Sequence, residues 1–200
     1  MKQALRLLRL LALAAALPLL AASVCERRPP ERQWQRGAFL LLPANTQAYQ
    51  LPSGISMVSI FGNLDPTQAS DLPLLATVHN SGQENVDVTL PAGLVFAPAS
   101  TEYQYMILLQ DFHFIATTGD RNVTVPTYCC NVDLYEPDEE SPYYIAGREW
   151  DLETEELLDL VADKSLSGEA AVMLAQDALY EITDGDGLTD TTRARLDSLP

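Results

Sequence analysis

The sequence predicts a mostly β protein of the α+β class, with a β-sandwich core followed by a small C-terminal helical subdomain. From residue 38 to about residue 135, short segments rich in β-branched and aromatic residues recur at roughly ten-residue spacing. Proline, glycine, asparagine or aspartate separates most of them. Beyond residue 150, apolar residues recur every three or four positions, as in amphipathic helices. Six or seven short strands at this spacing favour a β-sandwich over a barrel, and the helices that follow are expected to pack on it.

Residues 1–23 are expected to be a secretory signal peptide that is cleaved off and is not part of the folded domain. The segment begins with three cations, Lys2, Arg6 and Arg9, and continues as an apolar run over residues 10–22. Pro18 interrupts this run, which is short for a membrane-spanning helix. The chain is therefore expected to be exported, to the cell envelope or the extracellular space.

A basic, proline-containing linker is expected over residues 24–37. Residues 1–36 hold seven Lys or Arg against two acids, whereas the rest of the chain holds five against twenty-six. The linker is either a spacer or a segment that lies on an anionic membrane surface. Cys25 adds the alternative of a lipoprotein anchored through that cysteine, although Val24 is larger than the residue that usually precedes a lipidated cysteine. The acidic remainder excludes nucleic acid as a partner.

The expected single domain covers residues 38–200. Its strands are predicted within 38–43, 53–63, 72–80, 85–98, 103–116 and 122–135. The turns NSGQ (80–83) and TTGD (117–120) have the composition of hairpin turns.

An acidic loop over residues 136–142 separates the strands from three expected helices. The first helix is predicted from Trp150 to Ala162 and the last from Thr189 to Leu199. The middle helix covers residues 167–183, with Ser167 as its N-cap and Gly185 closing it.

Two chemical features stand out in the amino-acid sequence. Gln176, in LAQDALY (174–180), has apolar neighbours one helical turn away in both directions: Val172, Met173, Leu179 and Tyr180. A buried primary amide must find partners or it costs roughly 1–3 kcal/mol. Cys129 and Cys130 are adjacent, and a disulfide between neighbouring residues is strained and rare.

The dipeptide Tyr128-Cys129 and the segment Ala175–Tyr180 resemble the motifs of the thioester domains of bacterial surface proteins, which include adhesins. In those domains an aromatic-Cys strand motif and a Gln-x-Ala-apolar-Trp helix motif are joined as an internal thioester. The resemblance implies that Cys129 is the thiol and Gln176 the acyl donor. It also implies an apolar pocket, formed here by Tyr128, Val172, Ala178 and Tyr180. Such a protein would capture a nucleophile-bearing protein or glycan at the cell surface and would not act as an enzyme.

The chain departs from that pattern in three ways. Tyr180 stands in place of Trp, the interval between the motifs is short, and the cysteine is doubled. Cys130 is therefore an alternative thiol. Because successive side chains of a strand point to opposite faces, only one of the two can face the helix. The direct succession to Tyr128 favours Cys129.

Two alternatives remain for the function. In the first, the protein is a non-covalent binding or structural module of the envelope, with Gln176 an ordinary paired amide and both thiols in the core. In the second, a cysteine works with His79 or His113 in a hydrolase. No motif surrounds either histidine.

A single calcium loop is the one cofactor site that the sequence raises. Asp184, Asp186 and Asp190, together with Gly187, resemble one unit of the aspartate-rich calcium repeats of secreted proteins. The alternative is an acidic turn that ends the helix.

Overall fold

A computed structural model of the chain describes residues 48–65, 67, 69–148 and 152–200. The expected signal peptide, the linker with Cys25, the strand at 38–43 and Trp150 lie outside these residues. All described residues belong to one compact unit. Its strands are β1 (Ile55–Gly62), β2 (Leu74–Asn80), β3 (Val86–Leu90), β4 (Leu94–Pro98), β5 (Met106–Ile107), β6 (Phe112–Ala116), β7 (Gly119–Val125), β8 (Tyr128–Cys129) and β9 (Tyr143–Arg148). Its helices are α2 (Leu152–Val161), α3 (Glu169–Thr183) and α4 (Asp190–Asp197).

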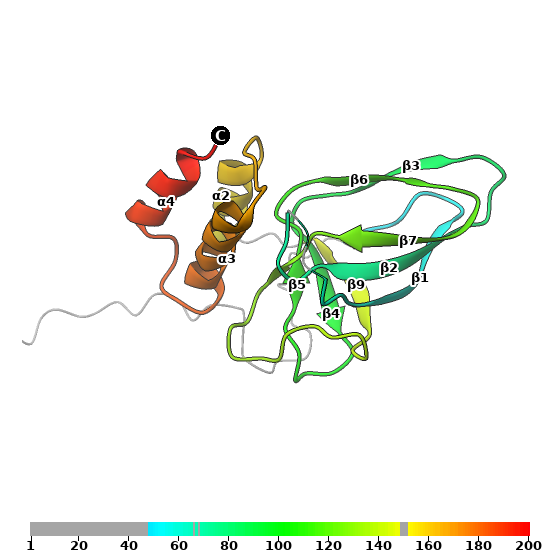
Figure 1. Cartoon of the computed structure of the whole chain (residues 1–200), viewed down its shortest axis with the longest axis horizontal. Helices are drawn as coiled ribbons and strands as arrows, with labels where there is room; N and C mark the ends of the chain where they lie inside the picture. The colour runs from blue at the N-terminus through cyan, green and yellow to red at the C-terminus, as the bar shows by residue number, and fades with distance from the viewer. Residues whose placement is uncertain (1–47, 66, 68, 149–151) are drawn as a thin grey trace, which may run out of the picture. The chain divides into compact units, whose positions relative to one another are not determined.

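The strands form small antiparallel sheets. Their orders are β1-β2-β7, β3-β6 and β8-β5-β4-β9. The prediction of a mostly β chain ending in helices is confirmed (Figure 1). Strands β1 to β6 and β8 fall within the predicted stretches, whereas β7 begins at Gly119, inside the expected TTGD turn. Strand β9 begins after the acidic loop and extends the strand region to Arg148.

The two expected hairpin turns instead connect strands of different sheets. NSGQ leads from β2, which pairs with β1 and β7, to β3, which pairs with β6. TTGD leads from β6 back to β7. Asn80 holds the two crossings together, because its side-chain amide donates to the carbonyl oxygens of Glu84 and Ala116 at 2.8 and 2.9 Å. These polar turn residues therefore mark a change of sheet.

Two apolar clusters lie on either side of β8. The strand-side cluster includes residues of every strand, among them Ile60, Val78, Phe96, Met106, Cys129 and Tyr143. The helix-side cluster joins β4, β5 and β8 to the helices and includes Val95, Ile107, Tyr128, Cys130, Leu157, Val172, Ala178, Leu179 and Leu196. Burial of these side chains is the main force that holds the helices on the sheet.

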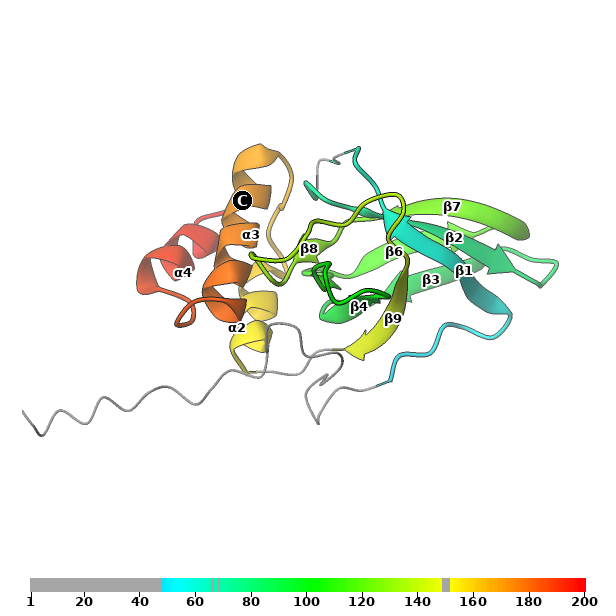
Figure 2. The same cartoon turned by 90° about the horizontal axis from the view of Figure 1, so that it is seen from below.

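The helices gather beside β8, with α3 closest to that strand (Figure 2). The predicted N-cap of α3 is wrong by one position, since Gly168 at φ 88° precedes the helix without a side-chain cap. The Ser167 hydroxyl bonds that of Ser165 instead, at 2.6 Å. Helix α4 begins as expected, because the Thr189 hydroxyl accepts from the backbone N–H of Thr192. Within the described residues, no helix has the length and apolar character needed to cross a membrane.

Candidate functional site

Within the described residues, strand β8 lies at the edge of its sheet, and one side of its backbone has no strand partner there. The flanking Cys130 N–H donates to the Tyr105 carbonyl oxygen at 2.9 Å, toward β5. Because backbone groups of successive strand residues point to opposite edges, the N–H and C=O of Cys129 face away from β5. Both groups need partners at this buried position.

Gln176 of α3 supplies both partners. Its Oε1 accepts from the Cys129 N–H at 2.9 Å, and its Nε2 donates to the Cys129 carbonyl oxygen at 2.8 Å. The side-chain amide thus pairs with Cys129 as a residue of a neighbouring strand would. The two sequence motifs, 47 positions apart, meet at this contact.

The Cys129 side chain points into the strand-side cluster and is completely buried. Burial raises the pKa of its thiol to about 12, and the carboxylates of Glu136 and Asp71 act in the same direction. The Tyr180 hydroxyl hydrogen-bonds this thiol and opposes part of the shift. Burial and the neighbouring thiol in turn raise the pKa of Tyr180. At neutral pH the thiol is therefore almost entirely protonated.

Cys130 faces the opposite way, into the helix-side cluster, and it too is completely buried. The expected alternation of the two thiols is therefore observed, but the thiol that packs among residues of α3 is that of Cys130. Tyr128 shares the face of Cys130, and its hydroxyl donates to the Ala69 carbonyl oxygen at 2.8 Å. Neither Cys129 nor Cys130 is in a disulfide.

The four expected pocket residues divide between the two clusters. Tyr128, Val172 and Ala178 are buried in the helix-side cluster, while Tyr180 packs on the strand-side cluster next to Cys129. A hollow of about 290 Å³ opens one turn before Gln176, lined by Thr67, Asp71, Glu169, Val172 and Met173. Val172 and Met173, which line this hollow, lie four and three positions before the half-buried Gln176 on α3.

Sequence reasoning missed Gln104, which joins the site to the loop that follows β8. Its Oε1 accepts from the Asn131 N–H at 3.3 Å and lies 3.4 Å from the Tyr180 hydroxyl. Its backbone carbonyl accepts from the Tyr143 hydroxyl at 3.0 Å. No local motif marks this residue, because its partners are distant in sequence.

The expected calcium residues do not converge on one point. Asp184 Oδ2 accepts from the Thr183 hydroxyl and from the Val132 N–H, whereas Asp190 pairs with Arg193 at 3.3 Å. Asp186 is exposed. In the part of the chain that the structure describes, no group of three metal-ligating side chains is found. Calcium binding stays a prediction.

The two histidines lie on the sheets away from the cysteines. His79 Nδ1 bonds Asp120 Oδ1 at 2.6 Å across β2 and β7, and His113 Nδ1 bonds the Thr89 hydroxyl at 2.8 Å across β3 and β6. Both bonds join facing residues of paired strands. They give no support to a Cys-His nucleophile.

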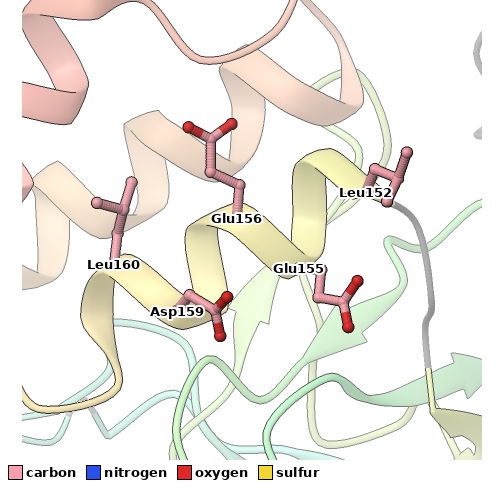
Figure 3. Close-up of a pocket in the computed structure, with 5 residues that line it drawn as sticks. All are labelled: Leu152, Glu155, Glu156, Asp159 and Leu160. Atoms are coloured by element: carbon pink, nitrogen blue, oxygen red, sulfur yellow. The ribbon is translucent and has the colours of Figure 1, made fainter.

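The outer face of α2 has a separate hollow of about 420 Å³ that involves a single helix (Figure 3). Glu155 and Asp159 point to one side of the helix, while Glu156 and Leu160 point to the other. Glu156 is held by Arg193, whose Nε and Nη2 donate to its two oxygens at 2.6 and 3.0 Å. This hollow is therefore the solvent-exposed side of α2. Of the carboxylates that line it, that of Glu156 contributes to the packing of α2 on α4.

Comparison with known proteins leaves the Cys129–Gln176 contact as the main guide to function, because the chain matches no protein-family model, no curated protein sequence and no solved structure.

Proposed function

We propose that this chain is an exported surface protein in which Cys129 and Gln176 form an internal thioester that captures a nucleophile-bearing partner. The observation that carries the proposal is the pair of hydrogen bonds between the Gln176 amide and the Cys129 backbone. They hold the side-chain carbonyl carbon beside the residue that bears the thiol. The basic and then apolar N-terminal sequence supports export.

The hydrogen bond from the Cys129 N–H suits the chemistry of this reaction. At 2.9 Å from Gln176 Oε1, it stabilises negative charge that develops on the oxygen when sulfur adds to the carbonyl carbon. The C–S bond forms, the C–N bond breaks, and the thiol proton leaves on nitrogen as ammonia. The Tyr180 hydroxyl, which is hydrogen-bonded to the thiol, is placed to assist the proton transfer. The raised thiol pKa makes this a slow maturation step.

Burial would protect the product. Cys129 is sealed in the strand-side cluster, and Val172 and Leu179 cover neighbouring positions of α3. This burial limits the access of water to the sulfur side of the bond, as closed sites do for reactive intermediates. An amine or hydroxyl that reaches the half-buried Gln176 would take the acyl group and release the thiol.

We further propose that the sheets form a β-sandwich. All nine strands contribute to the strand-side cluster, and the chain crosses between sheets at both turns beside Asn80. Such crossings and a shared apolar layer are typical of sandwiches.

A non-covalent envelope module is the second candidate, and the completeness of the Gln176 pairing favours it. Both polar atoms of the amide are already satisfied, so the residue needs no chemical modification to occupy its position. In this case Gln176 is a clamp that fastens α3 to the edge of β8.

Intact mass spectrometry of the purified chain separates the two candidates. A thioester lowers the mass by about 17 Da, the mass of the ammonia that is lost. We expect this deficit in the wild type and in Cys130→Ala, but not in Cys129→Ala or Gln176→Ala. A full mass in the wild type, with the thiols of Cys129 and Cys130 alkylatable after unfolding, would leave the clamp as the role of Gln176.

A further inference from the structure

A groove of about 540 Å³ lies on the surface near Gln104 and shares no lining residue with the hollow beside Val172 and Met173. It is lined by Leu64, Tyr103 and the stretch 134–138. Tyr135 contributes an aromatic ring that is 69% exposed, beside the ring of Tyr103 at a centroid distance of 6.1 Å. Large aromatic and apolar side chains left open to solvent in one place are typical of binding surfaces.

Carboxylates surround these rings. The Tyr103 hydroxyl donates to Asp138 Oδ2 at 2.8 Å, and Glu136 also lines the groove. The hydrogen bond to Asp138 and desolvation raise the pKa of Tyr103, and the negative charges of Asp138, Glu102 and Glu140 act in the same direction. Within residues 48–65, 67, 69–148 and 152–200, these acids form no salt bridge with a Lys or Arg.

The groove is held in place by backbone hydrogen bonds. The Tyr135 N–H donates to the Glu102 carbonyl oxygen and the Gln104 N–H donates to that of Tyr135, both at 2.9 Å. On the other side the Gly62 N–H donates to the Asp138 carbonyl oxygen at 2.8 Å. A preformed surface avoids the conformational entropy cost of ordering its loops when the partner binds.

We propose that this Tyr103–Tyr135 groove binds an arginine or lysine side chain of a partner protein. A cation placed over an aromatic face is attracted by the ring, and nearby carboxylates add to that attraction. Donation of the Tyr103 hydroxyl to Asp138 makes its ring more electron-rich, which strengthens the effect. A neutral sugar would use the rings but not the carboxylates, and an anion would be repelled. The charge of the groove therefore selects a cationic partner.

The inference does not depend on the thioester, and its test uses variants away from Cys129 and Gln176. The probe is a fluorescein-labelled Gly-Arg-Gly-Arg-Gly peptide, whose anisotropy is followed at physiological salt as the purified chain is added. We expect Tyr135→Ala to weaken binding about fivefold, which corresponds to the free energy of one lost cation–π contact. Tyr135→Phe keeps the ring and is expected to bind as the wild type does. Since Tyr135 is mostly exposed, neither change threatens the fold.

Net charge alone must be separated from recognition by the groove. Asp138→Asn and Asp177→Asn remove the same charge, but Asp177 lies exposed on α3, outside the groove. We expect the first to weaken binding several-fold and the second to change it less than twofold, while a peptide with citrulline in place of arginine does not bind. Equal losses in both variants, unchanged binding by Tyr135→Ala, or binding of maltohexaose but not of the arginine peptide would each overturn the proposal.

Discussion

The Gln176 side chain takes the place of a neighbouring strand against Cys129, with bonds of 2.9 and 2.8 Å to its backbone N–H and carbonyl oxygen. One residue of a helix thereby closes the edge of a sheet. Helix packing and edge protection, which are separate requirements in most β proteins, here depend on the same amide.

In a chain whose Gln176 is an unmodified amide, replacing Gln176 by alanine is expected to lower the free energy of unfolding by about 1–3 kcal/mol, because both Cys129 backbone groups lose their partner. Urea denaturation followed by circular dichroism measures the loss. Asp177→Ala is the matched control, since Asp177 is the exposed neighbour on the same helix and should change stability by less than about 0.5 kcal/mol. Equal effects of the two substitutions would contradict the role of the amide as a clamp.

Stability at alkaline pH is expected to report the chemical state of Cys129. Burial raises the thiol pKa to about 12, above its ordinary value of 9.0, so the protonated thiol is favoured in the folded protein. Its contribution to stability is complete below pH 9 and is lost as the pH rises toward 12, because the unfolded chain releases the proton first. The slope attributable to this one group is about 1.4 kcal/mol per pH unit.

A comparison with Cys129→Ala isolates this contribution from that of the buried tyrosines. If Cys129 is a thiol, the stability difference between the wild type and the variant shrinks between pH 9 and pH 12. If Cys129 is in a thioester it has no proton to release, and the difference stays constant over that range. Urea midpoints at half-unit pH steps distinguish the two results.

Much of the fold could be predicted from local patterns. The β-branched stretches correctly predicted β1 to β6, β8 and the second half of β7, and the apolar periodicity predicted α2, α3 and α4. The pairing of the strands could not be predicted, because NSGQ and TTGD have hairpin composition whether or not their flanking strands pair. The strand β9 was missed because its sequence, YYIAGR, follows an acidic loop and contains a glycine.

The site shows the same division between local and distant information. Two short motifs indicated that Cys129 and Gln176 belong together, and the structure places them in contact. The motifs did not reveal that the contact uses the backbone of Cys129, since this depends on which edge of β8 pairs with β5. Gln104 and the Tyr103–Tyr135 groove also depend on contacts between distant segments, which no local pattern predicts.

The ion pair between Glu156 and Arg193 is expected to stabilise the packing of α2 on α4 at neutral pH. Because both side chains are partly exposed, Arg193→Gln should lower the free energy of unfolding only slightly. Arg193 lowers the pKa of Glu156, so the stabilisation is present above the ordinary carboxyl pKa and disappears as the pH falls and the carboxylate is protonated. Denaturation midpoints at pH 7 and pH 3 measure this.

Arg195→Gln is the control for the same loss of charge, since Arg195 is exposed on α4 and forms no salt bridge within the described residues. A deficit of Arg193→Gln that persists undiminished at pH 3 would show that the ion pair is not its cause.

The close approach of β1 to the groove makes Gly62 sensitive to an added methyl group. A Cβ at Gly62 would lie 2.4 Å from the Asp138 nitrogen and from the Pro137 carbonyl carbon, both backbone atoms that cannot rotate away. We expect Gly62→Ala to cost about 1–3 kcal/mol of stability by overpacking and to displace the 136–138 stretch that lines the groove.

Gly82→Ala serves as the control, because its Cβ would meet only the Asn80 side chain, at 3.1 Å. If the groove binds as proposed, Gly62→Ala should weaken binding of the arginine peptide while Gly82→Ala does not. An alanine at position 62 that changes neither stability nor peptide binding would show that the contact between β1 and residues 137–138 is looser than its geometry indicates.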